Sequence, residues 1–477
     1  MFNEITDIEF DIQESCNLRC TYCYLQSGEK KGNKIFTKSI FDCFFDKYKK
    51  TINKDKKINI SFWGGEPLIN FDLIEYIVTK FSSFKGINFL VVTNGTLINK
   101  KIALFCKSNN VRLQISLDGN EKTHNSLRKD KKGRATYDKI LSNIELCKSL
   151  GTEYSILTNL TKVSENPSSI IKEYHDKRIK SPYFNVVNPT TSENYKYLYP
   201  LDSKHVVADL IADFKKNFKY DIKKALLDYP NILYSIKRLF ASNQRTSCGL
   251  DKSRIAIKYD GTIYPCRRMI DRPDMCIGNV WDGITEKYNN MYHRVIDLNK
   301  NCKICEYKFF CGGPCFFEIL SRNNINYIQK DYCIFVKELY FETLKIMTKI
   351  FFNNADKYKA ISGLFNMVIL KDKIRFAMTS AISPDCIFIK LPKLNIIDLG
   401  SEGIIYNQSD FDKKHIANIT AMCILDLIDG KRTAINIAKE IATICNIKYD
   451  DIKEDVYMQL SAFLDFGFIE EAKYVVR

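Results

Sequence analysis

Residues 16–23 read Cys-Asn-Leu-Arg-Cys-Thr-Tyr-Cys, which sets Cys16, Cys20 and Cys23 in a C-x3-C-x2-C arrangement. A tight loop can bring thiols at these spacings to one centre, and soft thiolate ligands select iron–sulfur clusters, zinc or cuprous copper. Three ligands on a cube of four irons leave one iron open to a ligand from outside the protein. We therefore predict a metal centre here; three inert buried thiols are the simpler alternative.

A second array of cysteines lies between residues 248 and 333. Cys248, Gly261 and Cys266 form a C-x12-G-x4-C element. It is followed by a C-x2-C-x5-C-x3-C run and one later cysteine: Cys302, Cys305, Cys311, Cys315 and Cys333. The first four of these can also form a zinc site with four thiolate ligands. Zinc explains neither the three-cysteine first run nor the element around Gly261, so iron–sulfur clusters account for more of the pattern.

The composition is that of a soluble globular protein. The chain has 477 residues, 45% of them apolar, and a formal net charge of +16. Its length indicates about three domains. The charge fits an acidic partner or a nucleic acid, but the lysines are scattered along the chain, which favours solvated surfaces. No secretory signal opens the chain and no apolar run approaches the roughly 20 residues of a membrane span, so we expect a cytoplasmic protein without disulfides.

Residues 6–190 alternate between short apolar runs and amphipathic segments, which is the pattern of a parallel β/α sheet. The expected strands are Ile8–Gln13, Ile58–Trp63, Ile87–Val92, Val111–Leu117, Glu153–Leu157 and Tyr183–Val187. The expected helices are Lys38–Lys50, Phe71–Phe84, Ile98–Ser108 and Tyr137–Leu150, and residues 202–243 are also expected to be helical. Ligand sites collect at the carboxyl ends of such strands.

Glycines and polar residues stand at three of these strand ends. The strand 58–63 leads into Gly64-Gly65-Glu66-Pro67, whose glycines permit a close approach to the backbone and whose carboxylate can accept hydrogen bonds from an ammonium group. The strand 87–92 leads into Thr93-Asn94-Gly95. Ser116 and Asp118 are two residues apart and therefore share a face at the end of the fourth strand. They suit the hydroxyls or charged head group of a ligand, or they cap the loop.

The first cysteine run, with Tyr22 before its third cysteine, resembles the signature of radical S-adenosylmethionine (SAM) enzymes. The second array resembles the SPASM extension, which holds auxiliary [4Fe–4S] clusters. The first resemblance implies that Cys16, Cys20 and Cys23 hold the [4Fe–4S] cluster that binds SAM. The second implies two auxiliary [4Fe–4S] clusters, an outer one on Cys302, Cys305, Cys311 and Cys333 and an inner one on Cys248, Cys266 and Cys315. Cys276 is either an unexpected fourth ligand of the inner cluster or a plain buried thiol, and an open iron is the other possibility.

The same resemblance assigns the strand-end residues to SAM. Gly64-Gly65-Glu66-Pro67 matches the family's GGEP motif, which holds the methionine amino group. The implied SAM contacts are Tyr22, Gly64, Gly65, Glu66, Asn94, Ser116, Asp118 and Arg128. Arg128 would bind the SAM carboxylate through its planar guanidinium, or it is a solvent-exposed arginine. Phe184, Asn185 and Val187 either border the adenine or belong to the core, His124 is expected to be structural, and no catalytic acid or base is identified.

The last hundred residues differ in character. Cys386–Ile389 and Asn395–Tyr406 are expected to form a hairpin. Three helices should follow, the first ending at Asp429-Gly430, the second capped by Thr433 and the third spanning about Asp450 to Phe466. This pattern indicates a small winged-helix unit, and residues 429–433 resemble a turn of PqqD-like peptide-recognition domains. A DNA-binding winged helix and a structural appendage are the alternatives; residues 434–445 offer only Lys439 for DNA.

Taken together, the patterns and resemblances predict an α/β protein built from a partial (β/α)6 TIM-like barrel, a SPASM extension and a winged-helix-like domain. The expected boundaries are 1–243 for the radical SAM barrel, 244–350 for the SPASM domain, 351–375 for a helical connection and 376–477 for the PqqD-like peptide-recognition domain.

The resemblance implies that SAM is cleaved to a 5′-deoxyadenosyl radical, which abstracts hydrogen from a ribosomally synthesised precursor peptide and leads to a thioether or other crosslink. The auxiliary clusters would accept electrons, a flavodoxin or ferredoxin would donate one, and the C-terminal domain would bind the leader. No membrane or nucleic-acid partner is expected. One alternative is an anaerobic sulfatase maturase, although Arg267 replaces the aspartate that follows the matching cysteine in that family. The other is a non-enzymatic iron–sulfur winged-helix DNA-binding regulator.

Overall fold

The structure, a computed structural model, describes residues 5–25, 28, 34–49, 57–187, 201–219, 222–240, 253–285, 295–353, 382–400, 402–407 and 410–472. Cys248 and most of the expected connection at 351–375 lie outside these ranges. The chain divides into two compact units. The first comprises residues 1–231, 245–303 and 311–336, and the second comprises residues 232–244, 304–310 and 337–477. None of the helices in the described ranges is long and apolar enough to cross a lipid bilayer.

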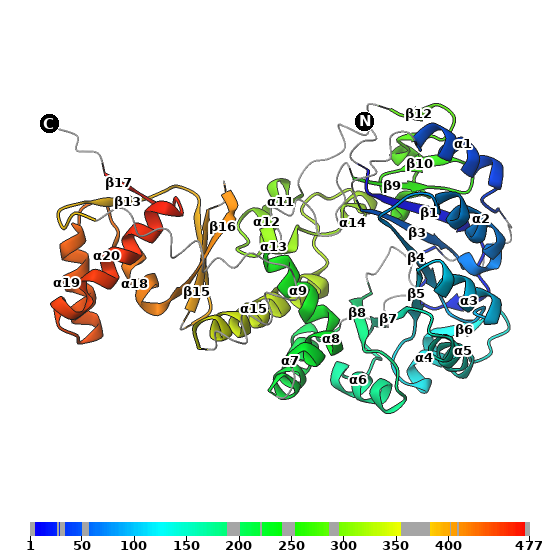
Figure 1. The fold of residues 1–477 in the computed structure, drawn as a ribbon, viewed down its shortest axis with the longest axis horizontal. Coiled ribbons are helices and arrows are strands. Elements are labelled where there is room, and N and C mark those ends of the chain that lie inside the picture. The colour runs from blue at the N-terminus through cyan, green and yellow to red at the C-terminus, as the bar shows by residue number, and fades with distance from the viewer. Residues whose placement is uncertain are drawn as a thin grey trace. The chain divides into compact units, whose positions relative to one another are not determined.

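A ten-stranded sheet forms the framework of the first unit (Figure 1). Its spatial order is β12 (Gly283–Ile284), β11 (Gly278–Asn279), β10 (Thr262–Tyr264), β9 (Arg254–Ile257), β1 (Asp7–Gln13), β3 (Ile58–Gly64), β4 (Ile87–Thr93), β5 (Val111–Ser116), β7 (Tyr154–Leu160) and β8 (Pro182–Val186). Neighbours from β9 to β8 are parallel, and β9 to β12 are antiparallel. All six predicted strands are confirmed; the largest deviation is in β7, which continues to Leu160.

Helices connect the parallel strands and cover one face of the sheet. They are α1 (Lys38–Tyr48), α2 (Phe71–Phe81), α3 (Lys100–Ser108), α4 (Glu121–Leu127), α5 (Tyr137–Leu150) and α6 (Pro167–Asp176). The four predicted helices are confirmed, and α4 and α6 were not predicted. Phe10 of β1 packs edge-on against Phe41 and Phe44 of α1 and stacks on Phe62 of β3. This aromatic layer is the core between sheet and helices.

The opposite face of the sheet is polar and yet buried. Glu9, Asp11 and Gln13 alternate with the aromatic and aliphatic side chains of β1, and their exposed fractions are 7%, 3% and 0%. Ser61 and Trp63 continue this face on β3, because Glu9 pairs with Ser61 and Asp11 with Trp63. This face of the sheet therefore presents carboxylate and amide side chains and is not a second apolar core.

The segment that begins at residue 253 extends the same sheet. Its strand β9 pairs with β1, with Ala256 opposite Glu9. Gly261 turns the chain from β9 into β10 with a φ of +83°, and a Cβ there would lie 2.6 Å from the ring of Trp281. The glycine of the C-x12-G-x4-C element is therefore required by the backbone conformation and by this contact.

The first unit has two further features that the sequence did not indicate. Strand β2 (Leu18–Cys20) pairs with β6 (Arg128–Asp130) in a short antiparallel ribbon. At the far end of the sheet, the Asn231 side chain accepts from Phe184 N and donates to Phe184 O, both at 2.8 Å. An amide side chain thus takes the place of a neighbouring strand along β8.

The remaining elements of residues 5–353 are helices and short 3-10 turns. They are η2 (Pro67–Asn70), α7 (Ser203–Phe218), α8 (Ile222–Asp228), α9 (Pro230–Phe240), η4 (Arg267–Met269), η5 (Pro273–Met275), α11 (Val295–Leu298), α12 (Lys300–Lys303), α13 (Lys308–Cys311), α14 (Phe316–Ser321) and α15 (Lys330–Asn353). The helices α7 to α9 confirm the helical prediction for the described residues between 202 and 240; residues 220–221 and 241–243 lie outside the described ranges.

In the second unit, the described residues between 382 and 472 form two small sheets and three helices. Strand β13 (Phe388–Lys390) pairs with β17 (Ile469–Glu471), and β14 (Leu394–Asp398), β15 (Glu402–Asn407) and β16 (Asp410–Asn418) form an antiparallel sheet in that order. The predicted hairpin between residues 386–389 and 395–406 is therefore wrong. Residues 395–406 fold back on themselves at Gly400, whose φ is +96° and whose N–H donates to Asp398 Oδ1.

The three C-terminal helices match the prediction closely. They are α18 (Ile419–Leu427), α19 (Ala434–Cys445) and α20 (Tyr449–Asp465). Thr433 caps α19, because its hydroxyl accepts from Asn436 N. Side chains from β15 and all three helices, including Ile405, Leu425, Ile441 and Phe463, are fully buried in one core.

Candidate functional site

The three cysteines of the first run lie in the loop and short strand that follow β1. Cys16 is 8% exposed, and its Sγ accepts from Leu18 N at 3.4 Å and from Asn94 Nδ2 at 3.8 Å. Cys23 N donates to Cys20 O at 3.1 Å, which closes a tight turn between these two cysteines. The turn brings the second and third cysteines of the run close together, as the spacing predicts.

The surroundings of Cys16 and Cys20 suit thiolates. Burial raises the pKa of the Cys16 thiol to about 12 and that of Cys20 to about 11, so both are neutral in the metal-free protein. N–H groups nevertheless point at both sulfur atoms: Leu18 N and Asn94 Nδ2 at Cys16, and the Arg128 guanidinium, at 3.9 Å, at Cys20. Donors of this kind stabilise a negatively charged sulfur. The residues present therefore fit a thiolate-bound cluster, whose binding would release the thiol protons.

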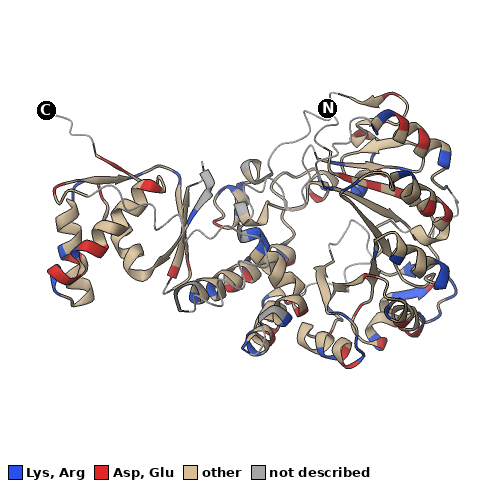
Figure 2. Ribbon diagram, viewed as in Figure 1, with Lys and Arg blue, Asp and Glu red and all other residues tan. Residues whose placement is uncertain are grey.

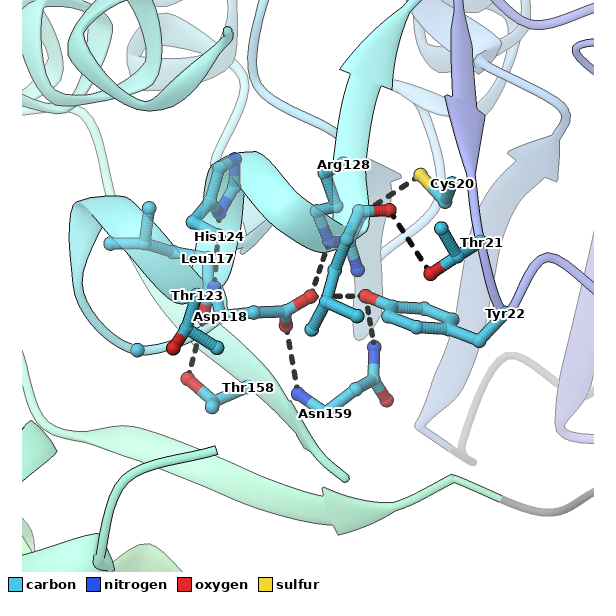
Figure 3. Close-up of polar contacts among 12 residues, drawn as sticks. Cys20, Thr21, Tyr22, Leu117, Asp118, Thr123, His124, Arg128, Thr158 and Asn159 are labelled. Carbon is cyan, nitrogen blue, oxygen red and sulfur yellow. Dashed lines mark hydrogen bonds and ion pairs between the residues drawn. The ribbon is translucent and has the colours of Figure 1, made fainter. Parts of the chain in front are cut away.

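Arg128 links this loop to the end of β5 (Figure 3). It lies on β6 directly opposite Cys20 of β2. Its Nε donates to Asp118 Oδ2 at 2.7 Å, and the two side chains are 7% and 0% exposed. The predicted alternative of a solvent-exposed arginine is thus wrong. Its guanidinium also lies 5.3 Å from the centre of the Tyr22 ring.

Asp118 is the centre of the hydrogen-bond network in Figure 3. Its Oδ2 also accepts from the Tyr22 hydroxyl, and its Oδ1 accepts from Asn159 N at 2.9 Å. The Asn159 side chain donates to the Tyr22 hydroxyl at 3.3 Å and accepts from Asn185 at 2.8 Å. Burial raises the pKa of Tyr22 well above its ordinary value, so the phenol stays protonated and remains a donor.

Apolar contacts and a buried histidine support this network. The Tyr22 ring packs against Leu127 and Val187. His124 Nδ1 accepts from Asp118 N at 3.2 Å, and its Nε2 is 3.1 Å from Thr136 Oγ1. Burial lowers the pKa of His124 to about 4, so the imidazole is neutral and holds the Asp118 loop, in agreement with the structural role expected from the sequence.

Gly64 and Gly65 are packed against the chain that leaves β1. Gly65 N donates to Gln13 O at 2.6 Å, and Glu66 N donates to Ser15 O at 3.1 Å. A Cβ on Gly64, whose φ is +149°, would lie 2.3 Å from Gln13 O, and a Cβ on Gly65 would lie 2.3 Å from Ser15 O. Both glycines are therefore needed to seat the cysteine loop, whatever ligand also approaches them.

Glu66 lies between the ends of β3 and β4 and is 1% exposed. Its carboxylate accepts from Thr93 Oγ1 and Asn94 N, both at 2.7 Å, and from Leu68 N at 3.1 Å. Burial raises the pKa of Glu66 to about 7 despite these donors. The structure thus gives Glu66 a role in holding two strand ends together that the sequence did not indicate; its contact with the SAM amino group stays a prediction.

Asn94 connects the end of β4 to the cysteine loop. Its Nδ2 donates to Asn17 Oδ1 at 2.8 Å as well as approaching Cys16, and Asn17 Nδ2 donates to Thr96 Oγ1 at 2.8 Å. Ser116 is buried at the end of β5 but is not joined to these hydrogen bonds within the described residues. The signal that would have found Asn17 is its place inside the cysteine run itself.

Two cysteines of the second array meet at Arg268. Its N–H donates to Cys266 Sγ at 3.4 Å and its Nη1 to Cys315 Sγ at 3.7 Å. These are two of the three cysteines that the resemblance assigns to the inner auxiliary cluster. Cys276 packs in the same apolar cluster as Cys266, but its thiol donates to Gly278 O at 3.2 Å.

The other assigned cysteines are placed less completely. Cys248 lies outside the described residues. Cys302 N donates to Asn299 O, Cys311 Sγ to Gly313 O, and Cys333 N to Gln329 O. Among the residues described, no three His, Cys, Asp or Glu side chains converge tightly enough to hold a single metal ion. Within the described residues this argues against a mononuclear zinc site. It does not argue against a cluster, because a cube of four irons binds its thiolates at separate corners.

Comparisons with known proteins agree with the motif geometry. Residues 11–174 match the model of the radical SAM superfamily. The chain therefore carries a radical SAM domain, and it is an enzyme that catalyses radical chemistry. This domain implies a [4Fe–4S] cluster and SAM as cofactors.

Among individual relatives, the chain is similar to the cysteine-type anaerobic sulfatase-maturating enzyme of Clostridium novyi, with 29% identity over 63% of this chain and 85% of that protein. It is 24% identical to the radical SAM cyclopropyl synthase TigE of Paramaledivibacter caminithermalis over 75% of this chain and 77% of that one. The solved structure of native anSMEcpe with bound AdoMet has the same fold, with a TM-score of 0.59, 23% identity, and coverage of 71% of this chain and 98% of that one.

Proposed function

We propose that this enzyme modifies a ribosomally synthesised precursor peptide by hydrogen abstraction with a 5′-deoxyadenosyl radical, forming a thioether or another crosslink. The proposal of a peptide substrate is supported chiefly by the second unit. Residues 382–472 form a core of their own from two small sheets and three helices. This unit contains none of the residues assigned to SAM, which suits a module that recruits a substrate rather than one that reacts with it.

In this proposal, Cys16, Cys20 and Cys23 hold the cluster, which when bound supplies the electron that splits SAM. Asn94 and Arg128 donate toward the cysteine sulfurs and thereby keep the loop closed around the metal. Asp118 holds Arg128 in place, and the outer groups of that guanidinium are positioned to bind the carboxylate of SAM.

The leader of the precursor is proposed to add as a strand to the three-stranded sheet of the second unit. Within the described residues, β14 and β16 each have one side without a neighbouring strand. A peptide strand gains main-chain hydrogen bonds at such an edge. On β14, Leu394 and Ile396 reach the apolar core while remaining partly exposed, so leader side chains can pack beside them.

The auxiliary clusters are proposed to accept the electrons that the oxidised peptide gives up, and a flavodoxin or ferredoxin is proposed as the external donor. The meeting of Cys266 and Cys315 at Arg268 supports the inner cluster. Tyr24 directly follows Cys23, and its ring centre lies 5.2 Å from the Arg268 guanidinium. This contact supports a position of the inner auxiliary cluster close to the SAM cluster.

Sulfatase maturation is the second candidate, since the anaerobic sulfatase-maturating enzymes of Clostridium are 26% and 29% identical to this chain over 63% of its length. Against it stands Arg267, which takes the place of the aspartate expected of that family as a base. A guanidinium remains protonated in proteins and cannot accept a proton from substrate.

A DNA-binding regulator is disfavoured by the enzyme assignment and by the charges of the second unit. Helix α19 carries Lys439 and next to it Glu440. In Figure 2 the ribbons of the helices of this unit carry both blue (basic) and red (acidic) segments. Groove binding needs several basic side chains on one helix.

The test is a titration of fluorescently labelled leader, core and full precursor peptides against the intact chain and against a chain that ends at residue 375. The precursor is sought as a short open reading frame beside the gene. We expect the leader and the precursor to bind the intact chain, and the shortened chain to cleave SAM but to bind the precursor far more weakly. Leader binding that survives the truncation, or salt-dependent binding of duplex DNA by the intact chain, would contradict the proposal.

A further inference from the structure

The turn that carries Cys266 is fixed over the buried polar face of the sheet. Arg267 begins the short helix η4, and its backbone N–H donates to Glu9 Oε2 at 3.0 Å. Glu9 is 7% exposed and also lies 3.5 Å from Arg254 Nη1. A buried carboxylate of β1 therefore determines where the Arg267 side chain begins.

The Arg267 side chain then reaches between two motifs of the radical SAM domain. Its guanidinium carbon lies 4.0 Å from the centre of the Trp63 ring and 5.6 Å from the centre of the Tyr24 ring. Trp63 directly precedes Gly64-Gly65-Glu66, and Tyr24 directly follows Cys23. The positive charge is thus held by two aromatic rings at the place where both motifs meet.

Among the described residues, Arg267 differs from the neighbouring arginines in having no acidic partner. Arg268 and Arg322 share Glu318, with N–O distances of 2.6 Å, and Arg128 has Asp118. For Arg267, no carboxylate within ion-pair distance occurs in the described part of the chain. Its Nε is buried and makes no hydrogen bond to any described residue. A buried donor without a partner carries a free-energy cost that a ligand can remove.

We propose that Arg267, between Trp63 and Tyr24, is a binding site for a carboxylate of the peptide substrate. This inference rests on the proposed peptide substrate and specifies its chemistry. A guanidinium presents parallel N–H donors that match the two oxygens of one carboxylate. The aromatic rings exclude water around the contact and provide apolar walls for the methylene groups of an acidic side chain. The site therefore selects the peptide segment that is presented to the radical.

The single guanidinium of Arg267 matches the single charge of a carboxylate. Arg268 and Arg322 both pair with the one carboxylate of Glu318, so Arg267 is the guanidinium that is offered to the ligand. The carboxylate can come from an aspartate or glutamate side chain or from the free C-terminus of a peptide. Both kinds of carboxylate offer the same two oxygens. Test peptides that contain only one kind of carboxylate distinguish them.

The experiment uses the reconstituted full chain with SAM present and measures binding of three N-trifluoroacetyl tripeptides by fluorine NMR at constant ionic strength. The first is Ala-Asp-Ala amide, the second is Ala-Asn-Ala amide, and the third is Ala-Asn-Ala with a free C-terminus. We expect a carboxylate peptide to bind at least about tenfold more tightly than the neutral amide. Preference for the first peptide identifies a side-chain carboxylate, and preference for the third identifies the C-terminus.

The variants R267Q and R272Q provide the comparison. Arg272 lies on the surface and already pairs with Asp274 at 2.6 Å, so R272Q should keep the preference for a carboxylate. R267Q should lose it while binding SAM as the wild type does. The proposal is overturned if all three peptides bind the wild type equally or not at all, or if the preference survives in R267Q. It is also overturned if R267Q fails to bind SAM, because the guanidinium would then serve the cofactor.

Failure of this site and failure of the proposed function give different results. If R267Q modifies the precursor normally, the proposed carboxylate site is wrong and the maturase assignment stands. Selective binding of a carboxylate peptide without any modified precursor removes the maturase assignment and leaves the site.

Discussion

The buried pair of Asp118 and Arg128 gives the sharpest stability prediction. D118A removes a carboxylate that is 0% exposed and that accepts from Arg128 Nε at 2.7 Å, from the Tyr22 hydroxyl and from Asn159 N. It strands a buried guanidinium, which typically costs about 3–5 kcal/mol. The double variant D118A/R128M removes that charge and leaves only neutral donors unsatisfied. We expect it to regain about 2 kcal/mol of the loss.

The assay is urea unfolding of the metal-free, reduced protein followed by tryptophan emission. The chain has two tryptophans, Trp63 and Trp281, and both belong to the first unit, so the signal reports the unit that contains the pair. E145A is the matched control, because Glu145 lies 2.6 Å from Lys148 but is 67% exposed. It should cost less than about 1 kcal/mol. If the double variant is no more stable than D118A, the cost does not come from the stranded charge and the reasoning is refuted.

Three further predictions concern other parts of the chain. Burial raises the pKa of Glu66 from 4.5 to about 7; the folded state therefore holds the proton more tightly, and its stabilisation is complete below about pH 4.5 and is lost as the pH rises through 7. The free energies of unfolding of wild type and E66Q, measured by urea titration across this window, should diverge by about 3 kcal/mol, and parallel pH profiles would contradict the assignment. C302A/C305A should abolish peptide modification, read by mass spectrometry, but keep some deoxyadenosine release; a normal rate of product would exclude the electron-outlet role. Y406F should destabilise the second unit by about 1 kcal/mol in urea followed by circular dichroism, since the Tyr406 hydroxyl donates to Glu306 O at 2.6 Å, and an unchanged midpoint would show that this bond adds nothing.

The parallel sheet was predictable because each strand is a short apolar run between amphipathic segments. Phe10 and Phe62 belong to these apolar runs, and in the structure they stack on each other in the core. The C-terminal hairpin was predicted wrongly because the apolar residues at the two ends of 395–406 suggest one long strand, although polar residues and glycines interrupt the stretch between them. The turn signal Gly400 was present in that stretch, but its significance depends on the left-handed backbone that the structure shows.

The cysteine motifs and strand ends were identified from local spacing, whereas the contacts that organise them are between distant residues. The ribbon of β2 and β6 is three residues long on each strand and has no hydrophobic period to reveal it. Asp118 and Arg128 are separated by a helix that the sequence did not indicate. Arg267 and Trp63 are about two hundred residues apart in the sequence. The pairing of β9 with β1 brings them together.

The assignment of the SAM-cleaving cluster is tested by comparing wild type with C16A/C20A/C23A after anaerobic reconstitution, with iron content and 5′-deoxyadenosine release in the presence of a reductant as the two readouts. We expect the variant to lose about four irons per chain and all deoxyadenosine release, while the iron of the second array remains. Deoxyadenosine release by the variant would contradict the assignment of Cys16, Cys20 and Cys23 to the cluster that cleaves SAM.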